Sequence, residues 1–168
     1  MSKLRPADWL AGLGGLILLG SLWLKWYGPD FSGLLPKGAR GAHVLVVNGA
    51  QPFAPDLTAW QAFSVLDVIL ALIALLAIAV PVVTAFATSP AKPVALSLLA
   101  SVFCALAALL ILYRIVNQPG SNALVAVKPG AWIGFAGALI ACAGSWLALA
   151  DERTPGAAPP QVPLRPAP

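Results

Sequence analysis

Three charged residues lie inside or at the ends of apolar segments, where they could form ion pairs. Asp67 is the only acidic residue inside a long apolar segment, while Lys25 and Arg114 lie near the ends of two others. A carboxylate within a bilayer is costly and usually pairs with a cation or faces a cavity. We therefore predict an ion cluster in which Asp67 bridges Arg114, with Lys25 as a third member. The alternative is that both cations extend to lipid headgroups while Asp67 is neutral or bonded to the backbone.

The residue types needed for catalysis or cofactor binding are missing or isolated. The single histidine, His43, and the cysteines Cys104 and Cys142 form no metal-ligand pattern, and we expect both cysteines to act as small packing residues. The sequence contains no nucleophile elbow, phosphate loop, dinucleotide fingerprint or zinc-protease motif. One intramembrane carboxylate is not an acid–base pair. We therefore expect no enzyme activity, no cofactor and no bound metal.

The composition indicates one lipid-embedded domain. The 168 residues are 60% hydrophobic and 10% charged, whereas soluble domains carry roughly 25% charged residues. A chain of this kind cannot bury its apolar surface in a core of its own. The net charge is +4, and the basic residues are scattered over the termini and loops. This distribution is typical of charges at membrane edges, so we expect the lipid bilayer, and no nucleic acid, as a partner.

Four apolar segments position these residues. We expect them to form helices at about residues 9–27, 62–88, 94–116 and 130–150. The first is read as a retained helix because no small-x-small cleavage site precedes its polar end. A polar flank at 1–8 precedes this domain, and a proline-rich tail at 151–168 that we expect to be disordered follows it. The predicted fold class is an all-α membrane protein, a four-transmembrane-helix bundle with a long first loop.

That first loop, residues 28–61, is the longest polar excursion of the chain. It is too long for a tight connection, so we expect a small folded cap over one end of the helices. Inside it, residues 43–47 followed by Asn48-Gly49 predict a short β-strand and a turn. A second short strand is expected at 123–127, between the last two helices.

Rows of small residues mark the faces on which the helices should pack, because close backbone approach favours contacts in lipid. The clearest row lies on the last helix and comprises Gly130, Gly134, Gly137, Ala141 and Gly144. Asp67 begins the row of the second helix, Lys25 continues that of the first, and Arg114 lies near that of the third. The sequence therefore places these three charges at one end of the bundle, whichever way it is inserted.

The charge distribution favours cytoplasmic N- and C-termini only weakly. Four spans put both termini on one side, and either orientation places five Lys or Arg residues in the cytoplasm. The first helix often decides orientation, and its short flank carries Lys3, Arg5 and the α-amine. With that orientation, loop 28–61 is extracytoplasmic.

Several pieces of the chain together carry a resemblance. They are a first helix ending in Trp-Tyr, the runs Trp60–Asp67 and Tyr113–Gly120, a glycine-rich last helix and an acidic stop at Asp151-Glu152. In these the chain resembles a group of small, uncharacterised four-span integral membrane proteins of actinobacteria, over roughly residues 9–153. The resemblance implies a bacterial plasma-membrane location and brings no known activity with it.

Three functions are compatible with these observations. The favoured one is a structural or accessory membrane protein that packs with itself or with a larger membrane complex. The second is a minimal proton or cation transport or sensing unit that uses Asp67, although transporters usually show repeated halves and broken helices. The third is a surface-contact protein that acts through loop 28–61, which has no disulfide pair.

Overall fold

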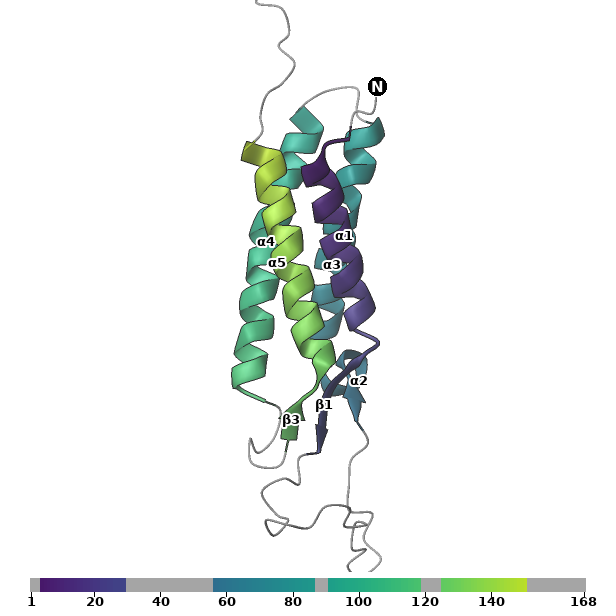
Figure 1. Ribbon diagram of the computed structural model, residues 1–168, viewed down its shortest axis with the longest axis vertical. Coiled ribbons are helices and arrows are strands. Elements are labelled where there is room, and N and C mark those ends of the chain that lie inside the picture. Colours follow the sequence, from purple (N-terminus) through teal and green to yellow (C-terminus); the bar gives the residue numbers. More distant parts are fainter. Residues whose placement is uncertain (1–3, 30–55, 87–90, 119–124, 151–168) are drawn as a thin grey trace, which may run out of the picture.

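A computed structural model describes residues 4–29, 56–86, 91–118 and 125–150 of the chain. Its elements in order are α1 (Pro6–Ser21), β1 (Lys25–Pro29), β2 (Leu57–Thr58), α2 (Ala59–Ala62), α3 (Leu66–Phe86), α4 (Ala91–Val116), β3 (Val125–Val127) and α5 (Pro129–Ala150). The four longer helices run lengthwise beside one another, and the strands and α2 gather at one end (Figure 1). We call this end the sheet end, and the other, where α1 begins and α5 ends, the terminal end.

Each long helix packs along two others: α1 lies against α3 and α5, and α4 lies against the same two helices. Three of them, α3, α4 and α5, are long and apolar enough to cross a membrane. Helix α1 has 16 residues, and at 1.5 Å per residue it is about 24 Å long, less than the roughly 30 Å of a bilayer core. The described residues therefore contain three candidate spans rather than the four expected.

The first helix ends earlier than the sequence predicts, at Ser21 instead of near residue 27. Hydrogen bonds from the amides of Leu22, Trp23 and Leu24 to carbonyls three residues back tighten the last turn. The Trp26 indole then donates a hydrogen bond to the Ser21 carbonyl at 2.7 Å and so satisfies one of the helix's terminal acceptors. Our prediction was wrong here because an apolar run does not distinguish the end of a helix from a buried strand.

The predicted second helix is divided in two. Helix α2 is one turn, and the Gln61 side chain caps its start: Gln61 Oε1 accepts a hydrogen bond from the Thr58 amide at 3.1 Å. Phe63 then adopts an extended conformation (φ −129°, ψ 153°), and α3 begins at Leu66. The other helix starts differ less from the predicted ones. Helix α4 begins at Ala91 instead of 94, and α5 begins at Pro129 instead of 130. Helix α1 begins at Pro6, inside the flank 1–8 that was expected to precede it.

A three-stranded antiparallel sheet of order β2-β1-β3 closes the sheet end. Tyr27 pairs with Val127 on one side of β1 and with Leu57 on the other. Strand β3 lies within the 123–127 segment expected to be extended, whereas the strand expected at 43–47 falls outside the described residues. The sheet therefore joins both connections between long helices at this end of the bundle.

Candidate functional site

An ion cluster does lie at the sheet end, but its members differ from those expected. Asp56, just before β2, accepts a hydrogen bond from Lys25 Nζ at 2.8 Å, and Lys128 Nζ lies 3.9 Å from its other carboxylate oxygen. The hydrogen bond from Lys25 is the main cause that lowers the pKa of Asp56. A Cβ atom on Gly28 would overlap both Asp56 and Lys128. Glycine at this position of β1 therefore permits the cluster to close over the strand.

A buried aromatic group lies beneath the sheet. Trp26 and Tyr27 are fully buried, and each ring meets that of Phe63 edge-on at 5.8 Å between centroids. The Arg114 guanidinium lies over the Phe63 ring, 4.7 Å from its centroid. Edge-on ring pairs and a cation over a ring face are both attractive. These four residues thus connect β1, the α2–α3 connection and the end of α4.

The Tyr27 hydroxyl donates a hydrogen bond to the Arg114 carbonyl oxygen at 3.0 Å. Burial raises the pKa of Tyr27 from 10.0 to about 12, although the nearby Arg114 charge acts in the opposite direction. A phenolate at this position would lose its bond to the carbonyl and would be poorly solvated. The neutral phenol is therefore the form that stabilises the sheet end.

This arrangement predicts an alkaline limit to stability. The folded pKa of Tyr27 exceeds the unfolded value, so its contribution is complete below pH 10 and is lost as the pH rises toward 12. We expect Tyr27→Phe, which cannot ionise, to show a smaller fall in melting temperature between pH 9 and 12 than the wild type. Melting curves over this range check it, with the exposed Tyr113→Phe as control. Parallel curves for all three proteins would contradict the assignment.

Asp67 lies where the small-residue row predicted, on the buried side of α3, and is 4% exposed. Its Oδ1 accepts a hydrogen bond from the Val68 amide at 2.8 Å. Within the described part of the chain, however, Asp67 forms no ion pair. The predicted pairing fails because Lys25 lies on a strand and reaches Asp56, while the extended backbone at Phe63 brings that ring beneath Arg114.

Asp67 and Arg114 should consequently act independently in stability measurements. Residues that share no partner usually have mutational effects that add within about 0.5 kcal/mol. We expect the loss of stability in Asp67→Asn/Arg114→Ala to equal the sum of the two single losses, as measured by unfolding in mild detergent. If the double variant were instead more stable than Arg114→Ala alone, the result would support the predicted ion pair between Asp67 and Arg114. The matched comparison is Lys25→Ala with Asp56→Ala. Because these two residues form an ion pair, the loss of stability in their double variant should differ from the sum of the two single losses.

The five small residues predicted on the last helix lie on the face of α5 that packs against α1 and β1. A Cβ atom at Gly137 would lie 2.6 Å from the Leu18 nitrogen, and one at Gly144 would overlap the Ala11 backbone. Similarly, a Cβ at Gly130 would lie 2.5 Å from the Lys25 carbonyl, one at Gly134 would lie 2.9 Å from the Trp26 ring, and Gly14 of α1 faces Ala141. This row is therefore used inside the chain and is not free for a partner.

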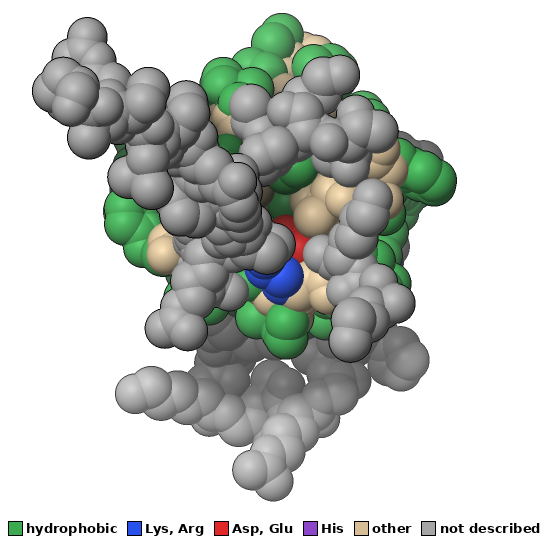
Figure 2. All heavy atoms as spheres, turned by 90° about the horizontal axis from the view of Figure 1, so that it is seen from above, with side chains coloured by type: hydrophobic (Ala, Val, Ile, Leu, Met, Phe, Trp, Pro, Cys, Tyr) green, Lys and Arg blue, Asp and Glu red, His purple; other side chains and the backbone are tan. Residues whose placement is uncertain are grey.

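Sequence reasoning missed a second buried acid, Asp8. It is 3% exposed, and its Oδ2 accepts a hydrogen bond from the Arg5 amide at 2.9 Å at the start of α1. Viewed from the terminal end, acidic and basic side chains lie together in the middle of the bundle (Figure 2). An acidic side chain three residues after the N-cap residue, here Arg5, is a capping signal, but the flank was read only as polar.

Cys104 and Cys142 are free thiols, and the Cys142 Sγ lies 3.5 Å from the Ser101 carbonyl. Among the described residues, no three His, Cys, Asp or Glu side chains are placed to hold a metal ion; His43 lies outside them.

The fold and site define a mostly helical protein with three helices able to cross a membrane and a sheet fastened across one end. Comparisons with known protein families, curated proteins and solved structures found no match.

Proposed function

We propose that this chain is a small four-span integral membrane protein of structural or accessory type, located in a bacterial plasma membrane. The resemblance to small actinobacterial proteins supports the location. We take α1 as the fourth span because exposed aromatic residues flank it. Exposed tryptophans occur at both ends of the bundle: Trp9 and Trp146 at the terminal end, and Trp23, Trp60 and Trp132 at the sheet end. Two aromatic belts of this kind mark the two membrane interfaces.

One observation carries the accessory role: the charged and aromatic groups at the sheet end are engaged with one another. Asp56 holds Lys25 and Lys128, and Phe63 holds Arg114. Groups committed to such contacts fix the ends of helices and strands and are not presented to a substrate. Bulky aliphatic side chains cover the outside of the long helices. A rigid body with this surface fits packing in lipid against other membrane proteins.

Purification in a gentle detergent tests this role. We expect the tagged chain to retain a companion of fixed stoichiometry, either a second copy or another membrane protein, through size-exclusion chromatography. Alanine variants of exposed side chains on different helices, such as Leu72 on α3 and Trp132 on α5, should identify the contacting face because only one should release the companion. A monodisperse lone monomer from native membranes would contradict the proposal.

A surface-contact role is the second candidate, and the pairing of β1 with β2 favours it. Residues 30–55 leave the sheet at Pro29 and return at Asp56. The β1–β2 pairing and the Lys25–Asp56 ion pair hold these two points together. A segment whose ends are fixed loses less entropy on binding than a free one. Replacing residues 30–55 by a short glycine-serine linker should then abolish partner capture while leaving the melting temperature of the bundle unchanged.

Proton or cation handling by Asp67 is the third candidate. Its support is a buried carboxylate without an ion-pair partner among the described residues. Liposome flux that disappears in Asp67→Asn but persists in Asp56→Asn would replace the accessory role by this one.

A further inference from the structure

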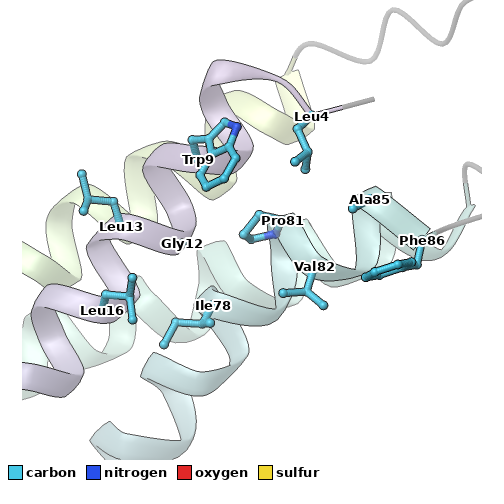
Figure 3. Close-up of a pocket in the computed structure, with 10 residues that line it drawn as sticks. All are labelled: Leu4, Trp9, Gly12, Leu13, Leu16, Ile78, Pro81, Val82, Ala85 and Phe86. Carbon is cyan, nitrogen blue, oxygen red and sulfur yellow. The ribbon is translucent and has the colours of Figure 1, made fainter. Parts of the chain in front are cut away.

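A lateral groove between α1 and α3 lies near the terminal end and belongs to none of the contacts described above. Its volume is about 410 Å³, and its lining consists entirely of hydrophobic residues and glycine. In Figure 3, α1 contributes Trp9, Leu13 and Leu16 to one side, and α3 contributes Ile78, Val82 and Phe86 to the other. We call this the α1–α3 groove.

The floor of the groove is set by a glycine and a proline. Gly12 faces Pro81, whose Cγ would lie 2.7 Å from a Cβ atom at position 12. The two helices therefore touch at this level, and the side chains on either side of the contact form the walls. The rim is open, since Trp9 is 63% and Phe86 is 82% exposed.

The groove runs along the helices rather than across them. Leu16 follows Trp9 by seven positions and Phe86 follows Ile78 by eight, so each wall extends about 10–12 Å at 1.5 Å per residue. One end lies at Trp9, an interfacial residue type, and the other lies toward the middle of the bundle. An elongated ligand would therefore lie parallel to the helices and enter from the membrane interface.

From this geometry we propose that the α1–α3 groove binds one acyl chain of a membrane phospholipid, with its glycerol end at the level of Trp9. Its volume falls in the range of small-ligand pockets, but such pockets usually carry a few polar groups that orient the ligand. This one has no polar lining side chain, so its ligand is a hydrocarbon. Its depth and its opening toward lipid match a chain that descends from the interface.

A second copy of the chain fits the groove less well. Transmembrane helices pack closely where small residues let their backbones approach. Here Gly12 is already covered by Pro81, and the rim consists of large side chains. A flexible hydrocarbon can follow such a surface, whereas a helix would be held away from it.

The test uses the full chain in phosphatidylethanolamine–phosphatidylglycerol vesicles that contain a phospholipid with a photoreactive diazirine in the middle of one acyl chain. We expect crosslinks concentrated on Leu13, Leu16, Ile78 and Val82, and native mass spectrometry should show one retained lipid. Ala85→Phe, which fills the groove, should lose both signals. Ala143→Phe adds the same ring to the exposed side of α5 and should keep them.

Melting curves establish that the variants are folded, and Leu13→Trp fills the groove from α1 if Ala85→Phe does not fold. Labelling spread evenly over all exposed helices, unchanged by either filling variant, would overturn the proposal. It would also be overturned if two differently tagged copies co-purified and Ala85→Phe separated them, since a second copy would then occupy the groove. The proposal needs the membrane-embedded arrangement but not the accessory role, so a lone monomer with a retained lipid would leave it intact.

Discussion

Trp26→Ala is expected to cause one of the largest losses of stability of any single substitution, about 3–5 kcal/mol, the range for deleting a large buried aromatic side chain. The side chain is fully buried, its ring packs edge-on against Phe63, and its indole donates to the Ser21 carbonyl. Its removal leaves a cavity and deletes one of the two hydrogen bonds that the Ser21 carbonyl accepts. Chemical or thermal unfolding in detergent measures the loss.

Trp132→Ala is the matched control because Trp132 is half exposed on α5. At this exposed position the same truncation removes little packing with the core, and we expect a change below about 1 kcal/mol. If both variants lost similar stability, the sheet end would not be the anchor that the structure indicates. Trp26→Phe should be intermediate, since it keeps the ring packing and loses the hydrogen bond.

Gly137→Val is the second substitution with a large expected effect. Its Cβ would lie 2.6 Å from the Leu18 amide nitrogen and 3.1 Å from the Gly14 carbonyl oxygen. Both neighbours are backbone atoms of α1, so no side-chain rotation relieves the overlap and the two helices must separate. Overpacking usually costs about 1–3 kcal/mol, and we expect the upper end of that range or a failure to fold. Fluorescence-detected size exclusion and melting temperature give the readout.

Gly20→Ala provides the control for the glycine series. Apart from its chain neighbours and the backbone of its own helix, no described atom lies within 4 Å of the position that its Cβ would occupy, and alanine is favoured over glycine in a helix by roughly 1 kcal/mol. We expect equal or slightly higher stability. A destabilising Gly20→Ala together with a neutral Gly137→Val would mean that α1 and α5 do not pack as described.

The helical body and its inner faces could be predicted from the sequence because long apolar runs and small-residue rows are local signals. The α5 row from Gly130 to Gly144 shows this: every member is buried, and spacing alone defines the face. Asp67 is likewise on the buried side of its helix. Such properties follow from the helical period and hold whichever neighbour the helix meets.

The partners of the charged residues could not be predicted in this way. Lys25 was placed on a helix that continued to residue 27, whereas the chain turns at Ser21 and Lys25 lies on β1. Asp56 was treated only as part of a polar loop. A side chain points in a different direction when a helix becomes a strand, so an error of six residues in the helix end changed the membership of the ion cluster.

The sequence by itself therefore determined a mostly helical chain with apolar helices, the segments that form them and the residues on their packing faces. Only the tertiary structure decided where α1 ends, which strands close the sheet end, and that Asp56 rather than Asp67 binds the lysine. The physical reason is that hydrophobicity and helical period act within one segment. Strand pairing, edge-on aromatic contacts and ion pairs instead depend on distances between segments that lie far apart in the sequence, 100 residues in the case of the paired residues Tyr27 and Val127.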